Sequence, residues 1–326
     1  MPAVVSSLMS RLVDQPTATG AVDADVIDGD LLAALGRVVD PRARRGVRHR
    51  LAVILALGAG AVLAGARSLV AIAEWASDLP PTARTRLGIG RAVPCESTIR
   101  RTLQSVDADA FDAVLGDWLA ARASQTEQRW PAIAVDGKTV RGARVGDGRA
   151  PHLLAAIGHA DGVVLAQRAV DGKTNEITEF APLLDGIDLT GVVVTADALH
   201  TQREHAAYLI GRSAHYLFTV KRNQPKLHAQ LASLPWAEVP VADTTVDKAH
   251  GRLEHRTLKV TAVAAGISFP HAATVAQIVR KRRPLGSRRW QSETVYVITD
   301  LDQAGIRPDE IADLARGHWC VENKLH

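Results

Sequence analysis

A series of short apolar segments that begins at residue 132 constrains the fold of this chain more than any other feature. Each segment is four to eight residues long and is bounded by polar or turn-forming residues, which is typical of β-strands. Helical patterns at Glu176–Leu184 and Gln202–Ile210 separate the last three segments. Three successive strands, followed by alternating helices and strands, predict an α/β fold whose mixed sheet opens with a meander. The segments are Ala132–Val135, Leu153–Ile157, Val163–Val170, Val192–Thr195 and Tyr216–Val220.

The residues before this sheet have helical rather than strand-like spacing. Leu51–Ala66 is a long, strongly apolar stretch without charge, and its sixteen residues fall short of the roughly 20 that a membrane helix needs. We therefore expect a buried helix at this position, within a small all-α domain. A polar run over residues 122–129 predicts the end of that domain. The expected organisation is an acidic flexible leader over 1–29, a helical domain over 30–122 and a second domain over 130–326.

Cysteine usage and the N-terminal sequence bear on the cellular compartment. Cys95 and Cys320 are the only cysteines, and neither has a second Cys or a paired His at metal-ligand spacing. Neither a disulfide framework nor a structural zinc site is therefore indicated. The N-terminus also lacks the basic start, apolar run and small-residue cleavage site of a secretory signal peptide. We expect a cytoplasmic protein that is not held in a membrane.

The positive charge is concentrated in the helical domain. Residues 41–101 contain eleven arginines and no lysine, against three acidic residues, which favours a polyanionic partner such as DNA. Helical spacing near Leu69–Trp75 and Ser97–Leu103 is compatible with a helix-turn-helix, although short capped helices occur in every all-α domain. A solvated basic face without a nucleic-acid partner is the alternative interpretation. The candidate DNA contacts of this domain are Arg42, Arg44, Arg45 and Arg48 on an exposed arm, with Arg100 and Arg101 on the second helix.

Three acidic residues stand where a carboxylate can project into a shared cleft. Asp136 and Asp197 each end an apolar strand segment. Glu322 belongs to a helix predicted to begin near Pro308, and it falls in the middle of that helix's apolar face. A carboxylate buried there needs a partner, either a divalent metal shared with other carboxylates or an ion pair, for instance with Arg316. The residues predicted to share this face are Ile311, Leu314, Ala315, His318, Glu322 and Leu325.

Several motifs occur in the order expected of one family. They are Ala-Val-Asp136-Gly-Lys138-Thr-Val-Arg141-Gly, Lys173-Thr-Asn175-Glu176-Ile177, Val-Thr195-Ala-Asp197-Ala-Leu-His-Thr201-Gln202, Tyr216-Leu-Phe-Thr-Val-Lys221-Arg-Asn223-Gln224 and Arg316-Gly-His318-Trp319-Cys-Val-Glu322-Asn323-Lys-Leu-His326. With these motifs the chain resembles bacterial insertion-sequence transposases of the DDE type, and among them the H-repeat-associated proteins. The resemblance covers about residues 30–326. It includes the associated N-terminal domain, through 40–49, 71–75 and 94–101.

The resemblance implies a ribonuclease-H-like catalytic domain with a β-rich insertion over about 225–300. Asp136, Asp197 and Glu322 would be its acidic triad, and its cofactor would be Mg²⁺ as two ions, with Mn²⁺ as a substitute. Phosphodiester chemistry needs an activated nucleophile, a stabilised leaving oxygen and charge compensation, which two such ions supply. Double-stranded DNA, as element ends and target, would be the partner of a homodimer. Strand-like segments at 258–263, 274–279 and 294–299 fit the insertion.

Further cations are candidate DNA contacts of the second domain. Lys138 and Arg141 follow the first Asp of the triad, and Lys221 with Asn223-Gln224 follows the fifth strand segment. A solvated turn or hairpin is the alternative in each case. Asp171 is an alternative to Asp136, because residues 170–174 repeat the pentapeptide of residues 135–139. The densest basic cluster is Arg280, Lys281, Arg282 and Arg283, for which DNA backbone binding is favoured.

The chain departs from the family pattern near its end. Related transposases often have Tyr and Arg where Ala315 and His318 stand here, and the sequence ends four residues after Glu322. Two functions are therefore open, namely a metal-dependent transposase that cuts and joins DNA, and a truncated, inactive remnant that still binds DNA. A nuclease without strand transfer is a third. Metal-dependent strand cleavage separates the first from the second.

Overall fold

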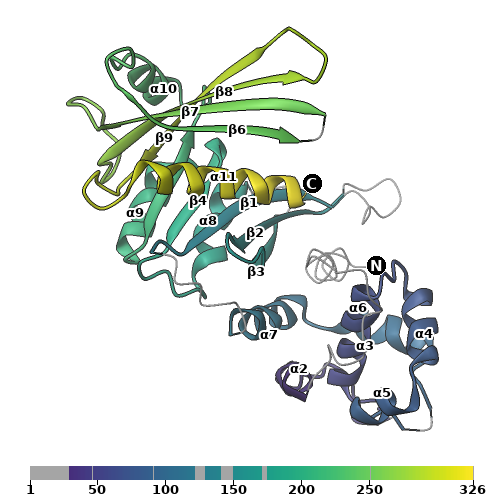
Figure 1. Cartoon of the computed structure of the whole chain (residues 1–326). Coiled ribbons are helices and arrows are strands. Elements are labelled where there is room, and N and C mark those ends of the chain that lie inside the picture. Colours follow the sequence, from purple (N-terminus) through teal and green to yellow (C-terminus); the bar gives the residue numbers. More distant parts are fainter. Residues whose placement is uncertain are drawn as a thin grey trace. The chain divides into compact units, whose positions relative to one another are not determined.

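The computed structural model forms two compact units (Figure 1). The first contains the chain up to Ser124 together with Lys138–Leu153 and Asp161–Gly172, and the second contains the rest. Most of the acidic leader, together with Arg141, Asp171 and Lys173, lies outside the described residues, as do the side chains of residues 320–325 and hence that of Glu322. The described residues are 29–45, 47–90, 92–121, 129–140, 150–170, 175–249 and 251–325.

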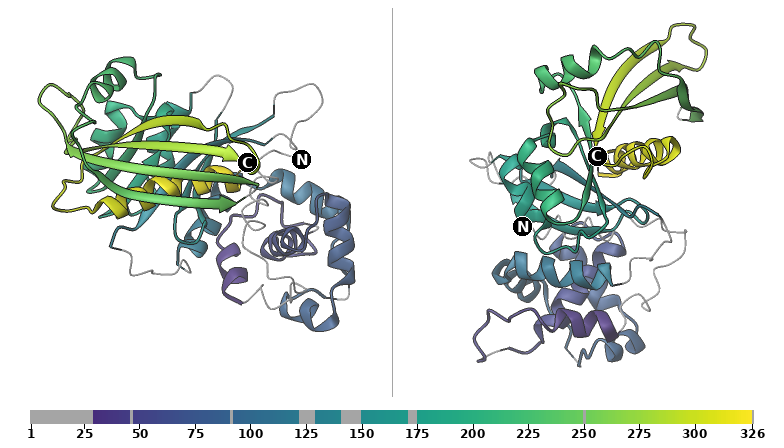
Figure 2. Two further views of the ribbon diagram at one scale, coloured as in Figure 1. Left: turned by 45° about the horizontal axis from the view of Figure 1, so that its top comes forward. Right: turned by 90° about the vertical axis from the view of Figure 1, so that its left-hand side faces the viewer.

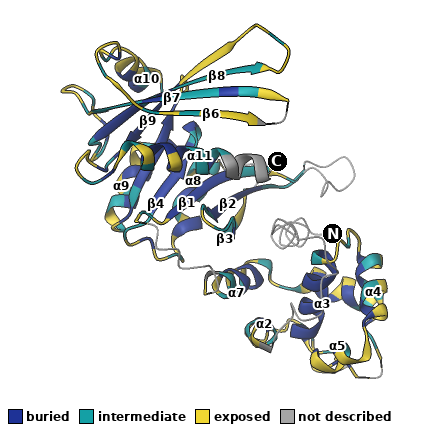
Figure 3. Cartoon of the chain, viewed as in Figure 1, coloured by how far each residue is buried: buried dark blue, intermediate teal, exposed yellow. Residues whose placement is uncertain are grey.

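The first unit is built mainly from helices packed around α3. Every residue of α3 from Leu51 to Val62 is buried (Figure 3), which confirms the predicted buried helix. A helix that is apolar on all sides needs neighbours on all sides, and the flanking helices provide them. No helix among the described residues has the length and apolar character needed to cross a membrane. The described helices of this unit are α2 (Gly29–Leu35), α3 (Leu51–Leu63), α4 (Leu69–Asp78), α5 (Pro81–Arg86), α6 (Glu96–Ser105) and α7 (Ala108–Ala120).

The predicted helix-turn-helix is corrected by the structure. The two expected helices are present as α4 and α6, but α5 lies between them in the chain. Pro81 occupies the first turn of α5, where proline's fixed φ and missing N–H suit a helix start. A further helix therefore begins at Pro81, and α4 and α6 are not joined by a single turn.

The strands form a nine-stranded sheet in the order β3-β2-β1-β4-β5-β9-β8-β7-β6 (Figure 2). β1 pairs with β4 and β4 with β5 in parallel, whereas β5, β9, β8, β7 and β6 pair successively in antiparallel fashion. The predicted mixed α/β sheet is confirmed. The strands are β1 (Ala132–Thr139), β2 (His152–Gly158), β3 (Val164–Val170), β4 (Val193–Ala196), β5 (His215–Val220), β6 (Val241–Ala249), β7 (Arg252–Ala262), β8 (Thr274–Pro284) and β9 (Gln291–Thr299).

The β-rich segment contains more regular structure than its apolar pattern predicts. β6 was missed because Val241–Ala249 is largely polar and exposed at the edge of the sheet. β8 continues through residues 280–284, where charged residues conceal the strand pattern. The helices of the second unit are α8 (Glu176–Leu184), the short 3₁₀ helix η3 (Ala198–His200), α9 (Arg203–Gly211), α10 (Pro225–Ala232) and α11 (Pro308–Leu325).

Helices cover both faces of the central strands. Ala132, Val193 and Leu217 point to one face, where they form a core with Ile311 and Leu314 of α11. Phe218, one position away from Leu217, points to the other face and contacts Phe180 of α8 edge to face. Side chains alternate between the two faces of a strand, so residues two positions apart lie on the same face. The same alternation determines on which face each polar residue of β1 and β4 lies.

Candidate active site

Strand register places Asp136 and Asp197 next to each other. β1 and β4 are parallel, with Ala134 opposite Thr195 and Val135 opposite Ala196. One residue further along both strands, Asp136 lies beside Asp197 at the same edge of the sheet, and neighbouring strands are about 4.8 Å apart. Both positions have the parity of the residues that face α11. Two of the three predicted acidic residues are therefore neighbours in the backbone register, on the side of the sheet that α11 covers.

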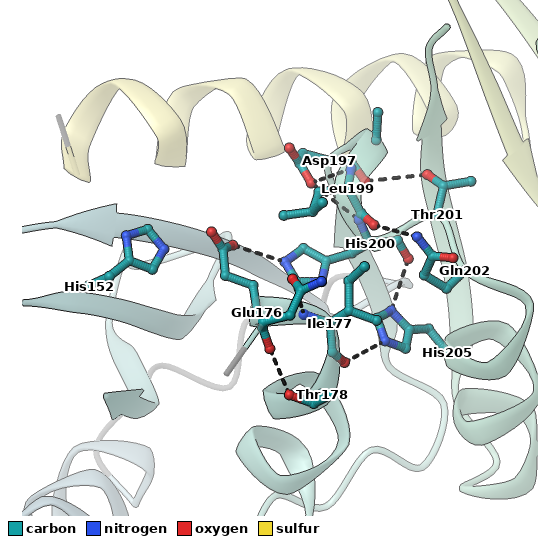
Figure 4. A network of polar contacts seen from close by, with 12 residues as sticks. His152, Glu176, Ile177, Thr178, Asp197, Leu199, His200, Thr201, Gln202 and His205 are labelled. Carbon is teal, nitrogen blue, oxygen red and sulfur yellow. Dashed lines mark hydrogen bonds and ion pairs between the residues drawn. The ribbon is translucent and has the colours of Figure 1, made fainter. Parts of the chain in front are cut away.

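The Asp197 carboxylate is oriented by the backbone that follows it. Its Oδ1 atom accepts hydrogen bonds from the amide of Leu199 at 2.9 Å and the amide of His200 at 3.4 Å, so Asp197 caps η3 (Figure 4). This cap uses one carboxylate oxygen and fixes the plane of the group. Oδ2 is then the atom through which Asp197 can meet a cation.

Asp136 differs from Asp197 in its burial, because only 8% of its surface is exposed whereas Asp197 is half-buried. An ionised carboxylate at that depth requires compensating charge or hydrogen bonds. A divalent cation shared with Asp197 would provide such compensation. Among the described side chains, no group of three or more His, Cys, Asp or Glu residues could hold a metal ion, and the side chain of Glu322 is not one of them.

The loop after Asp197 is braced by the motif that follows β5. The side-chain amide of Asn223 donates to the carbonyl of Ala198 at 2.6 Å, and that of Gln224 donates to the carbonyl of Thr201 at 3.0 Å. The Thr201 hydroxyl donates to the carbonyl of Thr219 at 2.6 Å. Asn223 and Gln224, expected as DNA contacts, thus make hydrogen bonds that hold the loop carrying Asp197.

A histidine cluster ties this loop to α8. Glu176 Oε2 lies 3.4 Å from His200 Nε2. The two ring nitrogens of His205 lie 3.0 Å from the carbonyl oxygens of His200 and Ile177 (Figure 4). Phe180 stacks on the His205 ring, with 4.0 Å between the ring centroids. Asn175 caps α8 by accepting from the Ile177 amide. Asn175 and Glu176, two residues of a predicted motif, therefore have structural contacts here.

A second polar cluster lies under the carboxylates, between β4 and α11. The hydroxyl oxygen of Thr195 is 2.8 Å from His159 Nε2 and 3.2 Å from His318 Nδ1. Burial lowers the pKa of His159 to about 4. Burial also lowers the pKa of His318 to about 3, with further lowering by the charges of His159, His200 and Lys221. Both imidazoles are therefore neutral at pH 7. Sequence reasoning missed His159 and Thr195, although a hydroxyl inside an apolar strand was an available signal.

The position of α11 agrees with the predicted final helix. It begins at Pro308, and Ile311, Leu314, Ala315 and His318 are buried, as expected for one face. Arg316, one example of an ion-pair partner suggested for Glu322, pairs among the described side chains with Asp313 and with Asp243, at 3.7 Å from the latter. Glu322 lies on α11 one helical turn after His318.

The predicted DNA contacts of the helical unit differ in what they bind within the chain. Arg42 contacts the Asp40 carboxylate at 2.7 Å and donates to the carbonyl of His49 at 2.9 Å. The Arg42 guanidinium holds the pKa of Asp40 below its usual value. Arg100 pairs with Glu96 along α6, and Arg101 donates to the carbonyl of Ser97. Arg44, Arg45 and Arg48 are exposed.

The basic residues of β8 also divide into two kinds. Arg280 makes two hydrogen bonds, of 2.6 and 2.9 Å, with the buried carboxylate of Glu254, which also pairs with Arg256. Both guanidinium groups lie 5.9 Å from the ring of Trp319 on α11. Arg280 therefore joins the β-rich segment to α11.

The other three cations of the β8 cluster have fewer internal contacts. Lys281 is exposed. Arg282 donates to the side chain of Gln291, and Arg283 donates to the carbonyl of Ser287 and lies over the ring of Trp290. Two further predicted contacts lie at the sheet: Lys138 is half-buried in β1, and Lys221 is exposed just after β5.

With the geometry established, comparison with known proteins identifies the class. Residues 128–326 match the family described as "Transposase DDE domain", and residues 32–119 match the domain described as "DDE_Tnp_1-associated". The chain therefore belongs to the DDE transposase family, which confirms the resemblance found in its motifs.

Individual relatives point the same way. The chain is 30% identical over 315 residues to "Putative transposase YncI" of Escherichia coli O157:H7, covering 91% of this chain and 78% of that protein. It is 27% identical over 310 residues to "H repeat-associated putative transposase YhhI" of Escherichia coli strain K12, covering 91% and 81%. A solved piggyBac transposase synaptic complex with hairpin DNA aligns at 9% identity with a TM-score of 0.39, covering 98% of this chain and 66% of that one. At that score the likeness supports no conclusion.

Proposed function

We propose that this chain is an insertion-sequence transposase that cleaves DNA strands at the ends of its element and joins the freed 3′-hydroxyl to target DNA. The observation that carries the proposal is the register of β1 and β4, which sets Asp136 beside Asp197 within a DDE transposase domain. Membership of the family makes strand cleavage and transfer the chemistry to test. The adjacent carboxylates give that chemistry a location at one edge of the sheet.

The fold of the second unit is proposed to be ribonuclease-H-like. The strands β1, β2 and β3 precede α8 in the chain, and β1, β4 and β5 are successive parallel strands of the sheet. The β-rich segment from β6 to β9 stands between the second Asp and α11, as the resemblance implies for an insertion before the last catalytic residue. This arrangement supports a domain that starts near residue 130 and a separate helical domain that ends near residue 122.

The residues proposed to hold the metal are Asp136, Asp197 and Glu322. Hard carboxylate oxygens are the ligands that Mg²⁺ prefers, and Mn²⁺ accepts the same set. The burial of Asp136 fits such a cation, because a buried carboxylate needs compensating positive charge. The orientation of Asp197 fits it too, because its capping bonds use Oδ1 and leave Oδ2 to bind a cation. Two ions held there would activate the nucleophile, stabilise the leaving oxygen and neutralise charge on the phosphate.

The chain's own residues would position the DNA strand at these carboxylates. Lys221 follows β5, the strand next to β4, and its ammonium group is suited to a backbone phosphate at the same edge. Asn223 and Gln224 keep the loop after Asp197 in one conformation. Arg44, Arg45 and Arg48 are exposed cations for a longer DNA segment, as is Lys281. We propose that the protein acts on double-stranded DNA in the cytoplasm, as a homodimer that brings two element ends together.

The deciding experiment is a cleavage assay on a labelled duplex that carries the element's own ends, with Mg²⁺ or Mn²⁺. The informative variant is Asp197→Asn, because asparagine caps a helix about as well as aspartate and removes only the charge. Asp107→Asn is its matched control, since Asp107 caps α7 in the same manner in the helical unit. Nicked and joined products from the parent chain and from Asp107→Asn, but not from Asp197→Asn, support the proposal. Binding of the duplex without any cleavage by the parent chain identifies the DNA-binding remnant instead. Nicking without a joined product identifies a nuclease.

A further inference from the structure

The polar cluster beneath the carboxylates connects three separate parts of the second unit through one hydroxyl group. Thr195 is on β4, two residues before Asp197, and its Oγ1 atom is 2.8 Å from His159 Nε2 and 3.2 Å from His318 Nδ1. His159 follows β2, and His318 is on α11. Thr195 and His318 are enclosed, with 0% and 3% of their surface exposed, and His159 is half-buried. We call these three residues the Thr195 cluster.

Gly317 allows the His159 ring to reach the helix. A Cβ atom at position 317 would lie 2.2 Å from His159 Nδ1 and 2.8 Å from its Cε1 atom. The ring therefore rests directly against the α11 backbone, one residue before His318. A side chain of any size at position 317 would displace the ring from the helix or the helix from the sheet. Two independent features, a shared hydroxyl and a missing Cβ, thus fix the same part of α11.

Hydrogen bonds at this depth specify position more narrowly than apolar contacts do. The distance and angle of a hydrogen bond are restricted to a few tenths of an ångström and about 30°, whereas apolar side chains tolerate sliding. A shift of α11 by one turn would move it about 5.4 Å along its axis and separate His318 from Thr195. Loss of either contact would leave a buried polar group without its partner, at a cost in free energy. The cluster therefore selects one axial position and one rotation of α11.

We infer that the Thr195 cluster positions α11 against the strand that carries Asp197, and thereby fixes the helix to which Glu322, the third residue proposed for the active site, belongs. Glu322 is four residues after His318, which is one turn along the same face of an α-helix. Asp197 is two residues after Thr195, on the same face of its strand. One hydroxyl group thus holds β4 and α11, which precede or carry two of the proposed triad residues, in a fixed position relative to each other. The role assigned to Glu322 rests on the proposed function, whereas the contact between β4 and α11 does not.

Amide hydrogen exchange in the full-length protein tests the positioning directly and needs no catalytic activity. Thr195→Val removes the hydroxyl group and keeps the shape of the side chain, so both imidazoles lose their contact with that hydroxyl. We expect the amides of residues 317–325 to exchange at least about tenfold faster than in the parent chain. The amides of α3, in the helical unit, serve as the internal reference. Thr195→Ser restores the hydroxyl group, and with it we expect most of the protection to return.

Gly317→Ala tests the same contact from the other side. The added methyl group meets the His159 ring, so exchange over residues 317–325 should again accelerate, although alanine by itself favours a helix. The control is Gly211→Ala in α9, where an added Cβ would meet nothing within 4 Å. Exchange that stays within twofold of the parent chain in both Thr195→Val and Gly317→Ala contradicts the inference. Global unfolding of both variants would assign these residues to stability alone and would also overturn it.

A cleavage assay then separates this inference from the proposed function. In Thr195→Val we expect the Mn²⁺ concentration for half-maximal cleavage to rise about tenfold, and Thr195→Ser to bring it back. A parent chain that never cleaves, while exchange responds as described, refutes the proposed function and leaves the positioning role standing. A parent chain that cleaves, with variants whose metal requirement and exchange are unchanged, refutes the positioning role alone.

Discussion

The cores of the two units differ in the kind of residue they bury. In the helical unit the described core is apolar apart from Thr102 and Asp112, and α3 contributes no polar side chain at all. The second unit buries many more polar groups. They include Asp136, Thr195, His200, His205, Glu254 and His318.

This difference indicates where the chain carries out chemistry. Burying a polar or charged group costs free energy unless the group is compensated, so a core rich in such groups is retained for reasons other than packing. The polar groups of the second unit lie on β1, β4 and α11, the elements that carry the proposed triad, and on the loop after β4, helix α9 and other strands of the sheet. Substitutions in the helical core should therefore act on stability, and substitutions among the polar groups should act on catalysis or on the position of α11.

The largest effect is expected at the carboxylates. Asp136→Asn should lower the rate of metal-dependent strand cleavage by about 10³-fold or more, because ligand charge that holds the cation contributes several kcal/mol to transition-state stabilisation. Single-turnover cleavage of a labelled element end measures the rate. Asp112→Asn is a buried carboxylate control in the helical unit. An Asp136→Asn protein that cleaves at the parent rate would remove Asp136 from the triad.

Loss of the buried carboxylate of Glu254 should destabilise the second unit strongly. Glu254→Gln leaves Arg256 and Arg280 facing each other without a compensating charge, which costs about 3–5 kcal/mol. Urea unfolding followed by tryptophan fluorescence measures the loss. Glu238→Gln, at an exposed position, should change stability little. Equal stability of the two variants would show that the carboxylate does not hold the two arginines together.

The apolar core of the helical unit should respond through packing alone. Leu57→Ala, at a fully buried position of α3, should lower the free energy of unfolding of that unit by about 2–5 kcal/mol. Val70→Ala on α4, where the side chain is 52% exposed, should lower it by no more than about 0.5 kcal/mol. Thermal unfolding monitored by circular dichroism compares them. An equal loss in both would contradict the central packing of α3.

Acid should weaken the second unit through its two neutral histidines. Burial places the pKa of His159 at about 4 and that of His318 at about 3 in the folded chain, below the ordinary value of 6.5. The unfolded chain therefore binds more protons between pH 6.5 and pH 4. Stability is fully present above pH 6.5 and falls as the pH decreases through that window, by up to about 1.4 kcal/mol per pH unit for each imidazole.

Urea unfolding of the parent chain and of His318→Gln at pH 7, 6 and 5 measures this dependence. The variant lacks one imidazole with a lowered pKa, so its stability should decline less steeply with acid. Identical slopes would show that the pKa of His318 is the same in the folded and unfolded states.

The smallest effect separates two neighbouring cations of β8. Lys281→Ala should weaken binding of duplex DNA about equally for all sequences and reduce the slope of log affinity against log salt by about 1, without loss of stability. Arg280→Ala should instead destabilise the fold, because the guanidinium group of Arg280 binds Glu254. Fluorescence anisotropy over a series of salt concentrations measures the slope. An unchanged slope in Lys281→Ala would remove this strand from the DNA interface.

Local patterns in the sequence determined much of this protein. Apolar segments predicted β1 to β5, and helical spacing predicted α8 and α11 nearly to the residue. The positions of Asp136 and Asp197 at the ends of strand segments predicted that they would meet, because parallel strands end at one edge. These features follow from periods of two and 3.6 residues, which neighbouring residues in the chain specify by themselves.

Partners far apart in the chain were decided only by the tertiary structure. Thr195 contacts His159 across 36 residues and His318 across 123, and no local pattern specifies such pairs. In the sequence, the four cations of the β8 cluster cannot be distinguished from one another. In the structure, strand register brings Arg280 to Glu254 and leaves Lys281 exposed. A side chain's role depends on which face of which neighbour it meets, and that is fixed only when strands pair and helices pack.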